Sequence, residues 1–135
     1  DIEAAAAFVH ADSFIESLPG GYHAKVIERG ASYSSGERQL ISFARTILRD
    51  PKVLILDEAT ANIDTETELL IQESMRKMRE GRTTIAIAHR LSTIRDAHLI
   101  LVLDKGRVIE RGTHEELIAK RGTYYDMYML QSMND

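Results

Sequence analysis

Apolar residues along the chain follow two spacings, which together predict strands alternating with helices. Short apolar runs at residues 53–56, 83–88, 99–103 and 107–111 predict four strands. The first two runs contain no charged residue, a pattern typical of strands that are buried on both faces in a parallel sheet. The turn residues at 104–106 predict a hairpin between the last two runs. The chain is therefore expected to have an α/β fold.

Apolar residues spaced three and four apart predict the helical segments. These segments are expected at residues 4–11, 13–18, 34–49, 65–81, 91–96, 113–120 and 123–133. Three of them open with the capping-box pattern S/T-x-x-E, at residues 34–37, 65–68 and 113–116. Residues 20–33 lack a helical or strand pattern and are expected to form a loop.

The composition is that of an ordinary soluble globular protein and excludes several classes. The chain has 135 residues, a net charge of −4 and no cysteine. The acidic balance gives no electrostatic footprint for nucleic acid, and the missing thiols exclude disulfides and thiolate metal sites. No apolar run approaches the ~20 residues of a membrane span. The chain opens inside a helical pattern, as a piece of a longer chain would.

Polar residues with chemical potential follow two neighbouring predicted strands. Asp57 and Glu58 come directly after the first strand, and His89 comes directly after the second. In open α/β sheets ligands bind beyond the carboxyl ends of the strands. Two carboxylates there could hold Mg²⁺ and accept a proton from water. Alternatively, the acids only cap a turn and the histidine is structural.

The start of the segment at residue 34 also allows two interpretations. Ser34 and Glu37 fit a capping box, which is a purely structural role. Ser34, Ser35 and Gly36 also supply hydroxyls and close backbone approach at the positive end of a helix dipole, which favours an anion. The two interpretations are compatible with each other.

Taken in order, these segments closely resemble the second half of the nucleotide-binding domain of ABC transporters, particularly of the exporters. Residues 33–37, Tyr-Ser-Ser-Gly-Glu, stand where the family has its signature, usually Leu-Ser-Gly-Gly-Gln. Residues 53–58 resemble the Walker B strand with its catalytic glutamate, residues 61–64 the D-loop, and His89 the switch histidine. Glu28-Arg29-Gly30 is similar to the exporters' loop that faces the transmembrane coupling helices.

The resemblance implies roles for the signature and the D-loop. In this family two such domains close head to tail around two ATP molecules. Ser34, Ser35 and Gly36, with Glu37 beside them, would approach the γ-phosphate of ATP held by the partner domain. Asp64 in the D-loop would communicate across the dimer, although its alternative role is that of a simple helix-start acid.

The resemblance also implies roles for the residues at the strand ends. Asp57 would hold Mg²⁺ through water, and Glu58 would polarise the attacking water. His89 would contact the γ-phosphate and position the water. Phosphoryl transfer needs mostly positioning and charge stabilisation, so these residues act only together with a phosphate-binding loop.

The fold implied is an incomplete P-loop NTPase (RecA-like) core with parallel strands flanked by helices, over residues 51–135. Residues 1–50 would be part of the helical signature subdomain. No G-x-x-x-x-G-K-[ST] sequence occurs in the chain, so the phosphate loop, or Walker A motif, is missing. The family's adenine-stacking aromatic residue and Q-loop are also missing. A domain truncated in this way is expected to expose apolar strand edges. Weak independent stability, rescue by self-association or a nonstandard arrangement of the final strands is expected to follow.

The function implied is that of the carboxyl-terminal part of an ABC exporter's ATPase subunit, with ATP and Mg²⁺ as ligands. Its partners would be a second nucleotide-binding domain, identical or different, and a transmembrane domain, at the cytoplasmic face of the cell membrane. The chain alone is expected to be inactive. One alternative is a non-catalytic assembly module. Another is an ATPase of the chromosome-maintenance or DNA-repair type, which the missing coiled-coil heptads oppose.

Two positions depart from the usual signature. Ser35 stands where the family has glycine, which is costly if that position needs a positive φ. Glu37 stands where the family has glutamine and brings a negative charge near a polyphosphate, unless the capping geometry holds it away. Both departures predict a weakened ATP site at this signature and hence a heterodimeric partner.

Overall fold

The computed structural model describes residues 1–58 and 62–134, and its contacts divide the chain into two compact units. The first unit spans Asp1–Ile85 and the second Ala86–Asp135. The expected division at residue 50 stays a prediction from the family resemblance.

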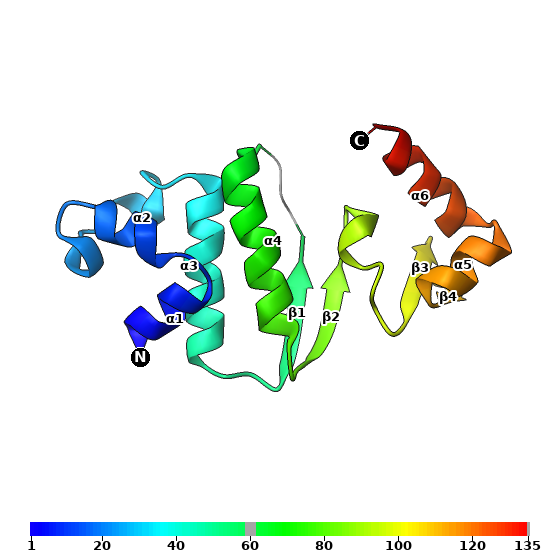
Figure 1. Ribbon diagram of the computed structural model, residues 1–135, viewed down its shortest axis with the longest axis horizontal. Helices are drawn as coiled ribbons and strands as arrows, with labels where there is room; N and C mark the ends of the chain where they lie inside the picture. The colour runs from blue at the N-terminus through cyan, green and yellow to red at the C-terminus, as the bar shows by residue number, and fades with distance from the viewer. Residues whose placement is uncertain (59–61, 135) are drawn as a thin grey trace. The chain divides into compact units, whose positions relative to one another are not determined.

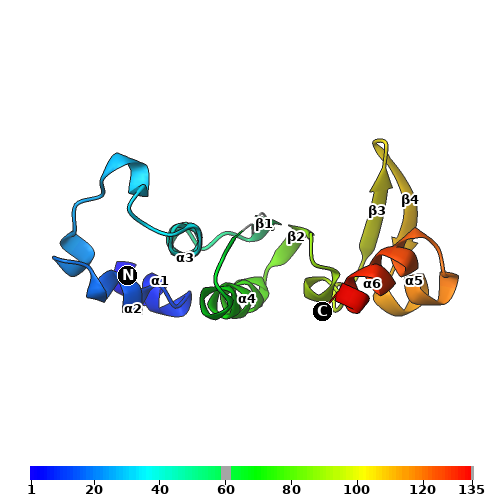
Figure 2. The ribbon, with the colours of Figure 1, turned by 90° about the horizontal axis from the view of Figure 1, so that it is seen from above.

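The first unit is built from helices that cover one face of a small sheet. Its helices and helical turns are α1 (Ile2–Phe8), α2 (Asp12–Ser17), the 3₁₀ turns η1 (Gly21–His23) and η2 (Glu28–Gly30), α3 (Ser35–Leu48) and α4 (Thr65–Arg79). Its strand β1 (Val53–Asp57) pairs with β2 (Thr83–Ile87), which begins in this unit. The two strands run in the same direction, and α3 and α4 lie side by side (Figures 1 and 2). This arrangement confirms the predicted α/β class with a parallel strand pair.

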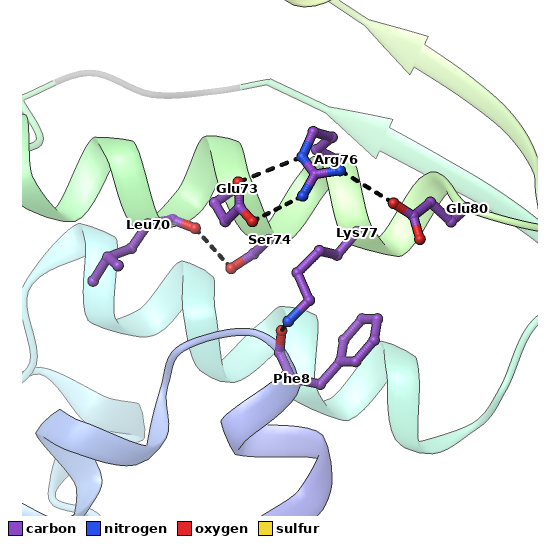
Figure 3. A network of polar contacts seen from close by, with 7 residues as sticks. All are labelled: Phe8, Leu70, Glu73, Ser74, Arg76, Lys77 and Glu80. Carbon is purple, nitrogen blue, oxygen red and sulfur yellow. Dashed lines mark hydrogen bonds and ion pairs between the residues drawn. The ribbon is translucent and has the colours of Figure 1, made fainter.

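The core of the first unit lies between α1, α3, α4 and the covered face of β1. Its buried members are Ala6, Val9, Ala11, Leu40, Phe43, Leu54, Leu56, Ile71, Met75 and Met78. Polar contacts join the end of α1 to α4. The Lys77 ammonium group donates to the carbonyl oxygen of Phe8 at 2.9 Å and lies 4.5 Å from the centroid of the same residue's ring (Figure 3).

The second unit is a hairpin packed against two helices. Strand β3 (Ile100–Asp104) pairs antiparallel with β4 (Arg107–Gly112), with an irregularity in the register between Val102 and Leu103. The 3₁₀ turn η3 (Leu91–Thr93) precedes the hairpin, and α5 (His114–Lys120) and α6 (Thr123–Asn134) follow it (Figure 2). Five buried residues form its core: Leu91, Ile100, Val102, Leu117 and Tyr124.

The prediction that the first two strands are buried on both faces is wrong for this structure. In β1, Leu54 and Leu56 are buried, but Val53 and Ile55 are exposed on the other face. In β2, every residue is exposed except the half-buried Thr84. Helices α3 and α4 cover only one face of this sheet, and the described residues supply no cover for the other. This exposure is of the kind expected for a sheet that lacks neighbouring strands.

Two smaller predictions are also wrong. The segment at 91–96 forms only the 3₁₀ turn η3. Thr65 does not cap α4; Asp64 takes that place, and its carboxylate accepts the Thr67 N–H at 2.9 Å. Both residue types are good N-caps, and the helix begins at the earlier of the two possible positions.

Candidate functional site

The start of α3 is shaped by a complete capping box. Ser34 is extended, with ψ of 163°, and its hydroxyl oxygen accepts the Glu37 N–H at 3.1 Å. The Glu37 carboxylate accepts the Ser34 N–H at 2.8 Å. The capping prediction is therefore confirmed. The Glu37 side chain turns back onto the main chain, so its carboxylate lies at the Ser34 N–H, at the amino end of the helix.

Ser35 fits its position without backbone strain. It is the first residue of α3 and is not among the non-glycine residues with positive φ. The cost that a serine would carry at a left-handed position therefore does not arise. Both Ser34 and Ser35 are exposed at the amino end of the helix. The Ser34 hydroxyl accepts the Glu37 N–H, and the Ser35 hydroxyl accepts a long hydrogen bond of 3.5 Å from Arg38 Nη2.

Gly36 joins the start of α3 to the start of α4. It is buried, and a Cβ atom added to it would overlap Thr67 Cγ2 and come within 3.3 Å of Ile63 Cγ2. Only a glycine allows the two helix starts to approach this closely. Asp64, the N-cap of α4, lies between Ile63 and Thr67 in the chain, so the predicted signature and part of the predicted D-loop are in contact.

Asp64 has the properties of a helix N-cap. It is exposed, and its acceptance of the Thr67 N–H lowers its pKa below the ordinary value of 3.8. The alternative role as a helix-start acid is thus present in the structure, and communication across a dimer stays a prediction. Ala61, which belongs to the same predicted loop, lies outside the described residues.

Asp57 and Glu58 differ in exposure at the end of β1. Asp57 is exposed, whereas Glu58 is only 3% exposed. Both residues line a hollow of about 110 Å³ between β1 and the two covering helices, together with Gln39, Ser42 and Ile71. A hollow of this size has room for a few water molecules.

Metal binding at this strand end would depend on few protein ligands. Within residues 1–58 and 62–134, no group of three or more histidine, aspartate or glutamate side chains could hold a metal ion. The exposed Asp57 carboxylate is a donor that fits Mg²⁺, which is usually held by one or two carboxylates together with water and substrate phosphates. Asp57, exposed at the end of β1, is the residue that would contribute.

His89 lies in the second unit, two residues after β2, and is exposed. Its carbonyl oxygen accepts a hydrogen bond from Gln131 Nε2 at 2.8 Å. The Leu91 N–H donates to Gln131 Oε1 at 2.9 Å. The sequence offers no signal for Gln131, because the contact joins residues 40 or more positions apart and no motif marks it.

The predicted coupling loop forms the 3₁₀ turn η2. Glu28 and Arg29 are exposed and have positive φ values of 45° and 58°. Gly30, with φ of 83°, is buried. The turn therefore presents two charged side chains outward on an unusual backbone conformation, which tolerates few residue types.

Comparison with known proteins places the chain in a family. The sequence model of the ABC transporter family matches residues 4–61. A protein of Streptococcus pneumoniae named as an ABC transporter ATP-binding protein is 69% identical over 131 residues, which is 97% of this chain and 22% of that protein. The chain belongs to the ABC transporter family.

Further relatives of this ABC transporter chain come from exporters. An ATP-dependent lipid A-core flippase of Syntrophus aciditrophicus is 52% identical over 99% of the chain and 22% of its own length. The solved structure of a bacterial Atm1-family ABC exporter with ATP bound matches with a TM-score of 0.84 and 47% identity, over 96% of this chain and 23% of that one. The chain thus spans about a fifth of the length of the relatives it matches.

The family resemblance predicted from the sequence is confirmed by these matches. The described helices include none that is long and apolar enough to cross a membrane. The roles of the individual site residues stay predictions.

Proposed function

We propose that this chain is the carboxyl-terminal part of the ATP-hydrolysing domain of an ABC exporter, in which ATP binding and hydrolysis drive transmembrane transport. The observation that carries the proposal is the match of 96% of the chain to an exporter with ATP bound, at 47% identity. The complete subunit would act at the cytoplasmic face of the cell membrane. Its partners would be a second nucleotide-binding domain and a transmembrane domain that docks near Glu28-Arg29-Gly30.

The amino end of α3 would complete the ATP site of the partner domain. Ser34 and Ser35 are exposed there, and Gly36 lets the main chain approach. The positive end of the helix dipole favours the γ-phosphate. The Glu37 carboxylate, held on the Ser34 N–H, places a negative charge at the same helix end, which would weaken this contribution.

The strand ends would serve this chain's own ATP site. Asp57 would hold Mg²⁺, which neutralises phosphate charge when bound. Glu58 would accept the proton of the attacking water, a contribution of roughly 10²–10⁴ in rate; the hollow beside it has room for water. His89 would donate to the γ-phosphate and orient the water.

Replacement of Glu58 with Gln in the full-length protein tests the proposal. The variant should bind ATP but lose about 10²-fold or more of the hydrolysis rate, because an amide cannot accept the proton. Glu66→Gln, an exposed change in the first turn of α4, is the matched control and should retain activity. Undiminished hydrolysis by Glu58→Gln would refute the base assignment.

The isolated chain is proposed to be inactive, because it has no phosphate-binding G-x-x-x-x-G-K-[ST] sequence. The same observation favours the alternative of an assembly module that contributes only its signature and dimer surfaces. Hydrolysis by the full-length protein decides between the two, because turnover that is lost in Glu58→Gln requires a catalytic role for this chain, whereas an assembly module needs no general base. Turnover by the chain alone would contradict both.

A further inference from the structure

The carboxamide of Gln131, on the last helix, bridges the main chain on both sides of Arg90. Its nitrogen donates to the carbonyl oxygen of His89 at 2.8 Å, and its oxygen accepts the N–H of Leu91 at 2.9 Å. The orientation of the amide follows from the chemistry, because a carbonyl only accepts and a main-chain N–H only donates.

The bridge resembles the pairing of a neighbouring β-strand. Arg90 has φ of −107° and ψ of 113°, close to the parallel-strand values of about −120° and +115°. Around an extended residue, the preceding carbonyl and the following N–H point to the same side. The Gln131 carboxamide therefore supplies the donor and the acceptor that the N–H and C=O of one residue on an adjacent parallel strand would supply.

The helix that carries Gln131 is itself firmly held in the second unit. Tyr124 on α6 is 1% exposed and shares the core with Leu91. Its N–H donates to Glu110 Oε1 at 2.8 Å, and its hydroxyl lies 2.9 Å from His114 Nδ1. The bridge thus connects the segment around His89 to a fixed element.

We propose that Gln131 is a positioning residue for His89. This inference rests on the proposed function, in which His89 contacts the γ-phosphate. The two hydrogen bonds hold the main chain of residues 89–91 extended. They thereby fix the main-chain position from which the exposed His89 imidazole extends. Without them this segment is held only by the turn that follows and by the buried Leu91 side chain, and the imidazole spends less time in the productive geometry.

Gln131→Leu in the full-length protein tests the inference, since leucine is similar in size and is a good helix former. Each net hydrogen bond contributes about a fivefold factor. The loss of one to both bonds should therefore lower kcat for ATP hydrolysis by about five- to 25-fold, with KM within about twofold. Hydrogen exchange in the peptide covering residues 88–93 should accelerate at least about fivefold. Ser132→Ala, which removes only a bond within α6, is the control and should leave both quantities unchanged.

A double-mutant cycle separates positioning from general destabilisation. In a His89→Ala background, Gln131→Leu should have no further effect on kcat, whereas a merely structural role would lower it again. Unchanged kcat or unchanged exchange in Gln131→Leu, with an impaired His89→Ala, would overturn the positioning role alone. Unchanged turnover in His89→Ala would overturn the proposed role of the histidine and this inference together.

Discussion

The hydroxyl oxygen of Ser74 lies 2.7 Å from the carbonyl oxygen of Val9, and the same hydroxyl lies 2.7 Å from the carbonyl oxygen of Leu70. Ser74 and Val9 are both 0% exposed. The contact to Val9 joins α4 to the end of α1 over 65 positions of sequence. It satisfies a carbonyl group that water does not reach.

Ser74→Ala should destabilise the chain by about 1–3 kcal/mol, because a buried carbonyl group loses its donor. The free energy of unfolding from urea denaturation measures the effect. Ser132→Ala is the matched control, since Ser132 makes the same bond to the residue four positions back on an exposed surface. It should change the stability by less than about 0.5 kcal/mol. Equal effects of the two substitutions would show that the bond to Val9 contributes nothing.

Gly36→Ala should disrupt the contact between the starts of α3 and α4. The added methyl group would overlap Thr67 Cγ2, and overpacking of this kind costs about 1–3 kcal/mol. Thermal or urea denaturation of the chain gives the stability. In the full-length protein, we expect ATP hydrolysis to fall as well, since the same glycine lets the main chain approach phosphate in the proposed site.

Thr67→Ser removes the methyl group that Gly36→Ala meets, while it keeps the N–H that Asp64 accepts. The double variant Gly36→Ala/Thr67→Ser should therefore recover most of the lost stability. If ATP hydrolysis recovers with it, the effect of Gly36→Ala is steric and lies within this chain. Recovery of neither quantity would contradict the observed packing.

Local chemistry made several of these features predictable from the sequence. The capping boxes at residues 34–37 and 113–116 form as expected, because each depends on a few adjacent residues. The four strands form as well. Their burial was not predictable, because it depends on which elements cover each face: Ile55, in a purely apolar run, is 68% exposed.

Features that depend on distant residues lie beyond sequence reasoning. The competition between Asp64 and Thr65 for the cap of α4 could not be decided from composition, since both are good N-caps. The approach of Gly36 to Thr67 and the bridge made by Gln131 join segments 31 or more positions apart. Nothing in their local sequence distinguishes these residues from exposed ones.

Glu37→Gln should restore charge complementarity at the proposed partner ATP site. A glutamine oxygen can accept the Ser34 N–H as the carboxylate does, so the capping box survives. Helix stability should fall by only about 0.3–1 kcal/mol, because the negative charge at the helix start is lost. Removal of a like charge near phosphate is worth about 1 kcal/mol at a solvated site. We therefore expect the full-length Glu37→Gln variant to associate at an ATP concentration about fivefold lower than the unchanged protein requires.

The control for that substitution is Glu66→Gln, which makes the same charge change at an exposed position on α4. It should leave the ATP dependence unaltered. Weaker association of Glu37→Gln than of the unchanged protein would mean that Glu37 has a favourable role in the site. The prediction that this signature gives a weakened ATP site would then be wrong.

Asp64 should make the stability of α4 depend on pH in the acid range. The Thr67 N–H holds the pKa of its carboxyl group below the ordinary value of 3.8. A lowered folded-state pKa gives a stabilising contribution that is complete above pH 3.8 and is lost as the pH falls through the folded-state pKa.

Asp64→Asn keeps an oxygen acceptor for the helix start but does not titrate. The stability advantage of the unchanged chain over Asp64→Asn should therefore shrink between about pH 6 and about pH 2.5, as measured by urea denaturation at each pH. Asp64→Ala, which removes the acceptor, should be less stable than Asp64→Asn at both pH values. A difference between the unchanged chain and Asp64→Asn that stays constant with pH would show that the carboxylate is not held by this hydrogen bond in solution.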